Sequence, residues 1–211
     1  GKALSAHNGP LVDSIEWASV EAYDVEGPDG VRVGSMLLKP PGYRPGRAYP
    51  TIVYVHGGPV GQDGFEFDVI SQALAARGYL VVNPNYRGSS GRGSAFSRAI
   101  YADWGNLEIQ DIHAVVDKLV EDGLSDPDRL GIGGWSYGGI NTNYAIARDT
   151  RFAAAFSGSG AANYLADVHF PSLPLFFAVE NERLDRERGA VLRLDLHNAQ
   201  HHLLGDLSDY F

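Results

Sequence analysis

The sequence of 211 residues contains no cysteine. Disulfide bridges, thiolate metal sites and cysteine nucleophiles are therefore excluded. Basic residues are also few, since 17 Lys and Arg stand against 26 Asp and Glu, the formal net charge is −9, and no basic cluster stands out. We expect no nucleic-acid partner for a chain of this charge.

Long apolar runs are missing as well. No stretch approaches the roughly 18 apolar residues of a membrane span. Residues 1–13 lack the pattern of a signal peptide. We therefore expect a soluble, cytoplasmic protein without a membrane partner, while a targeting segment ahead of residue 1 stays open.

The composition that remains is that of a globular protein. Hydrophobic residues make up 44% of the chain and charged residues 20%, which is ample material for a core. The length suits one sizeable domain. We predict a single α/β domain over residues 1–211.

The N-terminal part predicts an antiparallel hairpin. Two β-rich runs, 16–25 and 31–40, flank "EGPDG", whose Pro and Gly suit a tight reversal. A connector rich in Pro and Gly, 40–50, follows on the surface.

The middle of the chain alternates between strands and helices. Continuous apolar runs predict buried parallel strands, and apolar residues at helical spacing predict helices that end at glycines. We predict strands at 51–57, 79–85, 130–134 and 152–158, helices at 67–78, 107–123 and 140–150, a turn at 125–129, and two further strands at 172–180 and 190–196. This order predicts a mostly parallel sheet with helices on both faces.

The stretch "GGWSYGG", residues 133–139, fits the pattern Gly-x-Ser-x-Gly around Ser136. In a nucleophile elbow, a sharp turn between strand and helix holds such a serine in a strained backbone conformation with its hydroxyl exposed. The predicted strand before Ser136 and the predicted helix after it supply that context. The pattern therefore favours a catalytic serine over an incidental one.

The stretch "HGGP", residues 56–59, ends the first parallel strand. It matches the loop that gives one backbone N–H to an oxyanion hole, while the second N–H comes from the residue after the nucleophile. We predict Gly58 and Tyr137 as these donors. His56 is a rival for the catalytic base, but a role in holding the turn is favoured because the base of such enzymes follows the nucleophile.

Four stretches together resemble the catalytic domain of the prolyl oligopeptidase family of serine peptidases, especially its acylaminoacyl-peptidase-like branch. They are residues 49–59, 81–93, 111–147 and 151–168, and the similarity covers roughly residues 10 to 168. The resemblance implies an α/β-hydrolase fold and activity on short peptides or N-acylated residues. It also implies a β-propeller domain ahead of the hydrolase, and we identify no such domain in this chain.

The resemblance implies an acid and a base after the serine. "VENERL" is similar to the family's acid segment with Glu182 in the acid position, and "NAQHH" is similar to its histidine segment with His201 as base. Asp185 is the alternative acid, and His202 and His197 are alternative bases. Neighbouring histidines on a strand point to opposite sides, so His201 and His202 cannot both face the serine.

Two further stretches have structural interpretations. "NYRGS" resembles a family loop whose glycines and Arg87 shape the floor beside the elbow, and a direct substrate role for Arg87 is the weaker alternative. Asp103, Trp104 and Gly105 are expected to cap the following helix and pack the loop.

The last third of the chain departs from the family pattern. Helical segments expected before the acid and after the histidine are missing, so that 65 positions separate Ser136 from His201. The site is then either open or without a complete triad. Exposed apolar sheet surface makes a homo-oligomer possible.

We therefore predict a serine hydrolase of the peptidase type that acts on a short peptide or acyl substrate. Ser136 attacks the carbonyl, His201 accepts its proton and Glu182 orients the imidazole. No metal or organic cofactor is implied. A carboxylesterase and a catalytically impaired module of the same fold are the alternatives.

Overall fold

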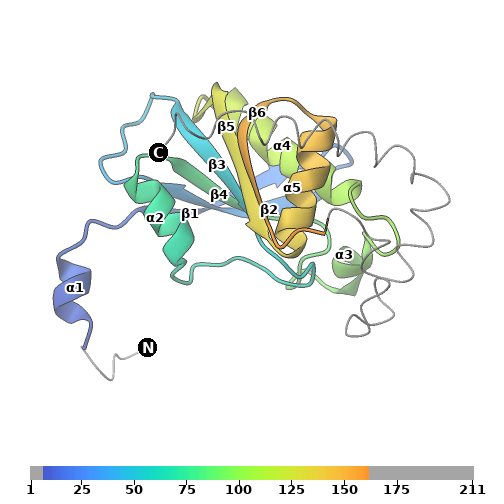
Figure 1. Ribbon diagram of the computed structural model, residues 1–211, viewed down its shortest axis with the longest axis horizontal. Coiled ribbons are helices and arrows are strands. Elements are labelled where there is room, and N and C mark those ends of the chain that lie inside the picture. Colours follow the sequence, from blue (N-terminus) through green and yellow to red (C-terminus); the bar gives the residue numbers. More distant parts are fainter. Residues whose placement is uncertain (1–6, 162–211) are drawn as a thin grey trace.

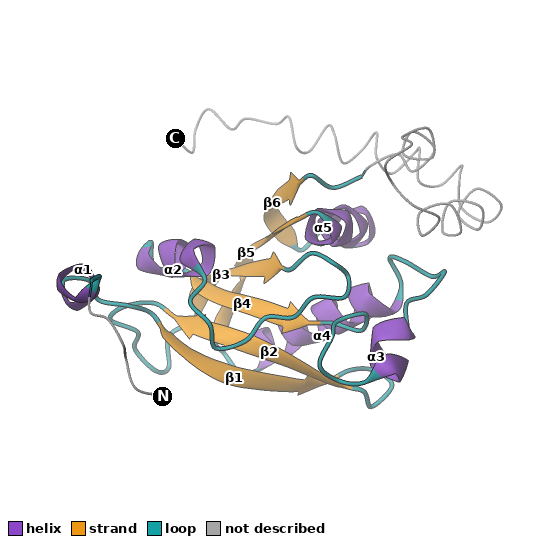
Figure 2. Ribbon diagram, turned by 90° about the horizontal axis from the view of Figure 1, so that it is seen from below, coloured by secondary structure: helices purple, strands orange, loops and turns teal. Residues whose placement is uncertain are grey.

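The computed structural model describes residues 7–161 of the chain. Their architecture is a twisted six-stranded sheet in the order β1-β2-β4-β3-β5-β6. Figure 2 shows these strands stacked from β1 at the bottom to β6 at the top. The strands predicted at 172–180 and 190–196 lie outside the described residues.

The predicted hairpin is confirmed. β1 (Ser19–Glu26) pairs antiparallel with β2 (Arg32–Lys39). Its turn is closed by the Gly27 N–H, which donates to the Val31 carbonyl at 2.7 Å, and Gly30 adopts a φ of 77° that favours glycine. β2 also pairs antiparallel with β4 (Leu80–Asn85), an outer strand of the parallel part.

The core of the sheet is parallel. β4 (Leu80–Asn85), β3 (Tyr49–Val55), β5 (Ser125–Trp135) and β6 (Phe152–Gly158) are joined by parallel pairings in that order. β4 is buried along its whole length, as expected for a strand with neighbours on both sides and covered faces. The sheet therefore has the α/β-hydrolase character that the sequence predicted.

Helices cover both faces of this sheet. α4 (Leu107–Glu121) and α5 (Tyr137–Arg148) pack with the larger apolar cluster, and α2 (Val69–Ala76) packs with a smaller one. Leu80 belongs to the first cluster and Val81 to the second, because successive side chains of a strand point to opposite faces. α2 and α4 end next to Gly78 and Gly123, both at positive φ, as predicted.

The predicted turn at 125–129 is wrong, because these residues already belong to β5. Tyr49 pairs with Ser125, but the next pair is Thr51 with Leu130, so the four residues between lie opposite one residue of β3. These four residues form an exposed irregularity in β5, and their sequence resembles that of a turn. α5 also begins three residues earlier than predicted, directly after Ser136.

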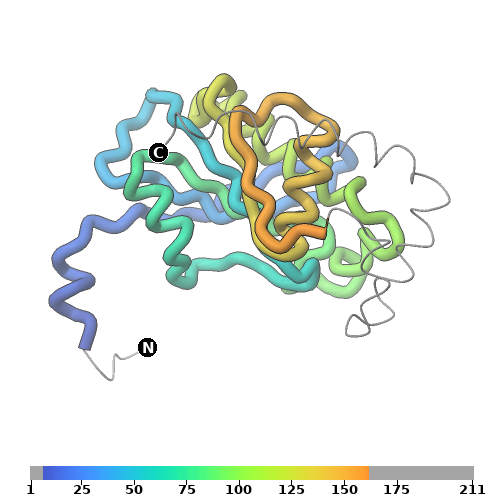
Figure 3. The backbone as a smooth tube through the Cα atoms, viewed as in Figure 1, coloured from blue at the N-terminus to red at the C-terminus, as the bar shows by residue number. Residues whose placement is uncertain are grey.

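Two short helices were not predicted, α1 (Gly9–Asp13) and α3 (Ser94–Arg98). α1 buries none of its residues and projects from the body of the domain (Figures 1 and 3). Within the described part of the chain, no helix has the length and apolar character to cross a membrane.

Candidate active site

Ser136 occupies the junction between β5 and α5. It has φ 57° and ψ −121°, a conformation that a non-glycine residue rarely adopts and that costs about 1 to 3 kcal/mol. Its N–H donates to the Gly158 carbonyl at 2.9 Å, and its own carbonyl accepts from the Ile140 N–H at 3.1 Å. The residue is exposed. Ser136 thus has the strained, outward-facing geometry of a nucleophile elbow.

The glycines around Ser136 are required by close packing. A Cβ on Gly134 would lie 2.8 Å from the Cα of Gly138, and one on Gly138 would lie 2.9 Å from the carbonyl carbon of Val55. A Cβ on Gly139 would lie 2.6 Å from the Gly158 carbonyl oxygen. Real Cβ atoms do not approach backbone so closely. The turn can therefore form only with glycine at these positions.

The loop after β3 meets the elbow at Gly57. A Cβ on Gly57 would lie 3.3 Å from the Cβ of Ser136 and 3.7 Å from the backbone nitrogen of Tyr137. Gly58 follows with a φ of 134°, which L residues rarely adopt. The two loops meet because β3 and β5 are paired in register up to their carboxyl ends. The predicted donors Gly58 and Tyr137 thus belong to segments that touch at the serine.

Both ring nitrogens of His56 form hydrogen bonds to groups other than Ser136. Nδ1 bonds the Gly57 carbonyl oxygen at 2.8 Å, and Nε2 bonds the Ser89 hydroxyl at 2.9 Å. The ring stacks on Tyr86, with centroids 4.5 Å apart. Burial lowers the pKa of this imidazole. The geometry supports a role for His56 in holding the turn.

The side chain of Tyr137 is anchored beneath the elbow. Its ring is buried and meets Trp104 edge to face at a centroid distance of 4.7 Å. Its hydroxyl donates to Oε1 of Glu108 at 2.8 Å. Tyr137, whose backbone N–H is the predicted oxyanion donor, is therefore also held in place by its ring and its phenol hydroxyl.

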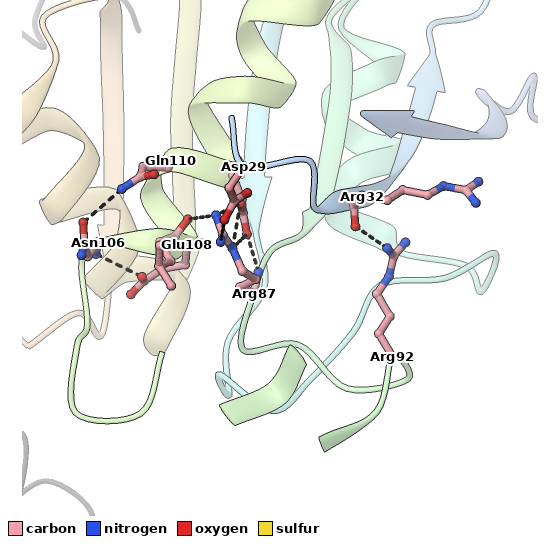
Figure 4. A network of polar contacts seen from close by, with 9 residues as sticks. Asp29, Arg32, Arg87, Arg92, Asn106, Glu108 and Gln110 are labelled. Atoms are coloured by element: carbon pink, nitrogen blue, oxygen red, sulfur yellow. Dashed lines mark hydrogen bonds and ion pairs between the residues drawn. The ribbon is translucent and has the colours of Figure 1, made fainter. Parts of the chain in front are cut away.

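Glu108 is fully buried and lies in the first turn of α4. Figure 4 shows it beside Asn106. Its carboxylate accepts the Gly105 N–H at 2.5 Å and the Asn106 N–H at 3.1 Å. Burial raises the pKa of Glu108, and these hydrogen bonds lower it only in part. The prediction that Asp103, Trp104 and Gly105 cap α4 needs correction, because Asn106 is the N-cap residue and Glu108 accepts the N–H groups.

Sequence reasoning missed Glu108, although a signal was present. Residues 108, 112, 115 and 119 share one face of α4 and all are buried. A glutamate at the first of these positions interrupts an otherwise apolar stripe, which marks a buried carboxylate with partners.

Arg87 serves the structure of the loop after β4. Its guanidinium is buried and donates from Nη2 to Oδ1 of Asp111 at 2.6 Å, and its backbone N–H donates to Oδ2 of Asp111 at 2.8 Å. Nη1 pairs with Asp29 of the hairpin turn (Figure 4). The side chain thus ties β4, α4 and the hairpin together, in agreement with the structural interpretation of "NYRGS".

The predicted acid Glu182 and base His201 lie outside the described residues, as do the alternatives Asp185, His197 and His202. Between residues 7 and 161, no group of three or more His, Asp or Glu side chains is placed to hold a metal ion.

Comparison with known proteins places this site in a family context. A sequence model of the prolyl oligopeptidase family matches residues 65–191 of this chain. An uncharacterized peptidase of Bacillus subtilis, YuxL, is 34% identical over 177 residues, which are 83% of this chain and 26% of that protein. Human dipeptidyl peptidase 8 is 35% identical over 159 residues, 72% of this chain and 17% of the relative.

Solved structures agree with these relatives. One structure of the acylaminoacyl peptidase of Pyrococcus horikoshii superposes with a TM-score of 0.81 and 29% identity, covering 90% of this chain and 32% of that one. A puromycin-hydrolyzing peptidase of Mycobacterium tuberculosis superposes with a TM-score of 0.69 and 31% identity, covering 78% of this chain and 26% of that one. The chain thus spans about a quarter of the length of the first curated relatives it matches.

Proposed function

Because this chain belongs to the prolyl oligopeptidase family of serine peptidases, we propose that it hydrolyses peptide or N-acylaminoacyl bonds of short peptides with Ser136 as the nucleophile. The observation that carries this proposal is the backbone of Ser136, strained at φ 57° between a buried strand and a helix. Backbone strain of this kind collects at functional sites, and the exposed position of Ser136 supports its use as a nucleophile.

The proposed reaction follows the serine-hydrolase scheme. Ser136 Oγ attacks the acyl carbonyl while His201 accepts its proton, and Glu182 orients the imidazole. His201 then gives the proton to the leaving amine, and water hydrolyses the acyl-enzyme with His201 again as base.

The N–H groups of Gly58 and Tyr137 are the proposed donors to the oxyanion. Support comes from the close approach of Gly57, the residue before Gly58, to the Cβ of Ser136 and the backbone nitrogen of Tyr137. One such donor typically contributes about 10² to 10³ in kcat.

The substrate class rests on the relatives. The superposed structures are named as acylaminoacyl and puromycin-hydrolyzing peptidases, which favours a short substrate with a free or acylated N-terminal residue. Hydrolysis of N-acetyl-alanyl and alanyl p-nitroanilides, measured beside p-nitrophenyl acetate, tests this proposal. We expect turnover of an anilide that Ser136→Ala abolishes. Ester turnover alone would indicate a carboxylesterase, and turnover of neither would indicate a catalytically impaired module.

A further inference from the structure

Glu108 lies directly behind the elbow, and the proposed reaction does not use it. Its side chain has no solvent exposure and accepts three hydrogen bonds, two from backbone N–H groups and one from a phenol. A buried carboxylate is costly to desolvate, so one that the fold retains at this place has a purpose beyond filling space.

The first turn of α4 makes the position favourable for a negative charge. Glu108 lies in that turn, where the helix N-terminus attracts an anion. The carboxylate also satisfies the N–H groups of Gly105 and Asn106, which have no partner within the helix. These contacts keep Glu108 in one place, so that it can serve as a fixed anchor.

Tyr137 links the Glu108 carboxylate to the proposed oxyanion hole. Its phenol donates to Glu108 at 2.8 Å, its ring packs on Trp104, and its backbone N–H is the proposed second donor to the oxyanion. A shift of the Tyr137 side chain therefore moves a group that must lie within hydrogen-bond distance of the reacting oxygen.

We propose that Glu108 is a positioning residue of the oxyanion hole, whose carboxylate holds the Tyr137 phenol and thereby fixes the Tyr137 N–H relative to Ser136. This inference rests on the proposed hydrolase function. A misplaced oxyanion donor weakens binding of the transition state more than binding of the substrate, so its loss appears in kcat and leaves KM nearly unchanged.

Steady-state kinetics on p-nitrophenyl acetate test the inference with Tyr137→Phe, Glu108→Gln and the double variant. Tyr137→Phe removes the phenol hydroxyl and keeps the backbone N–H. Glu108→Gln replaces the charged acceptor by a neutral and weaker one. Its amide NH2 must face either the Asn106 N–H, which Oε2 accepts, or the Gly105 N–H and the phenol, which Oε1 accepts. We expect each single variant to lose roughly tenfold in kcat, part of what a whole donor contributes. The double variant should lose no more than the worse single one, because both act through the same bond.

Tyr23→Phe is the matched control. The Tyr23 hydroxyl donates to Asp122 at 2.8 Å, so this variant removes a phenol-to-carboxylate bond of equal length just beyond the opposite end of α4. It should lower the melting temperature less than Tyr137→Phe does, because the Tyr23 bond is exposed and the Tyr137 bond is buried, and it should leave kcat at the parent value.

The possible outcomes distinguish a failure of the positioning role of Glu108 from a failure of the proposed hydrolase function. Parent values of kcat in both single variants, or a loss confined to KM, would overturn the positioning role while the hydrolase function stands. An equal loss of kcat in Tyr23→Phe would overturn it too, since general destabilisation would then explain the effect. A parent protein without turnover would refute the proposed function and this inference together.

Discussion

The Cα of Gly138 packs against the backbone carbonyl of Val55, and a Cβ on it would lie 2.9 Å from the carbonyl carbon. Gly138→Ala should therefore reduce the free energy of unfolding by roughly 1 to 3 kcal/mol or prevent soluble expression, and should reduce turnover by displacing the elbow. Gly9→Ala is the control, because nothing lies within 4 Å of a Cβ there. Urea unfolding of both variants decides the point. Equal stability of the two would show that the elbow is not tightly packed.

His56 holds the peptide group between Gly57 and Gly58 by a hydrogen bond. The Gly57 carbonyl, which Nδ1 contacts at 2.8 Å, and the Gly58 N–H belong to one planar group, so fixing the carbonyl also fixes the proposed donor. We expect His56→Asn to lower kcat by roughly tenfold to a hundredfold. A loss as large as that of Ser136→Ala would instead identify His56 as the base.

His201 is the proposed base, so His201→Ala should reduce turnover by several orders of magnitude, as Ser136→Ala does. His202→Ala should cost far less. The activity of the parent should rise with pH through an apparent pKa of about 6 to 7, where a free imidazole becomes a base. Parent rates in His201→Ala, with Ser136 still reactive, would place the base elsewhere in the chain.

Asp63 makes the stability of the domain depend on pH. Burial and the nearby carboxylates of Asp68 and Glu66 raise its pKa to about 7. The folded state then holds this proton more tightly than the unfolded state. The contribution of Asp63 to stability is fully present below the unfolded pKa of about 4 and is lost as pH rises to about 7.

Asp63→Asn should raise the free energy of unfolding at pH 8 by roughly 1 to 3 kcal/mol and have little effect at pH 4. The exposed Asp13 provides the control, since Asp13→Asn removes the same charge from the surface. Urea titrations at both pH values give the comparison. An identical change at pH 4 and pH 8 would contradict the buried, shifted carboxyl.

The elbow was predictable because its requirements are local. The glycines around Ser136 and the strand and helix beside it all lie within a short stretch. The meeting of Gly57 with Ser136 was also accessible, since neighbouring parallel strands end at one edge of the sheet. The contact of Glu108 with Tyr137 was not, because it joins Tyr137 to a helix almost thirty residues earlier, and no local pattern encodes that pairing.

The most direct test of the account is the intact mass of the folded chain after reaction with a fluorophosphonate. Covalent labelling requires an activated hydroxyl, so we predict a single adduct, located at Ser136 by peptide mapping and absent from Ser136→Ala. The buried Ser89, whose hydroxyl bonds His56, should stay unmodified in both proteins. A folded chain that gains no adduct, or one whose Ser136→Ala variant is labelled equally, would contradict the assignment of Ser136 as nucleophile.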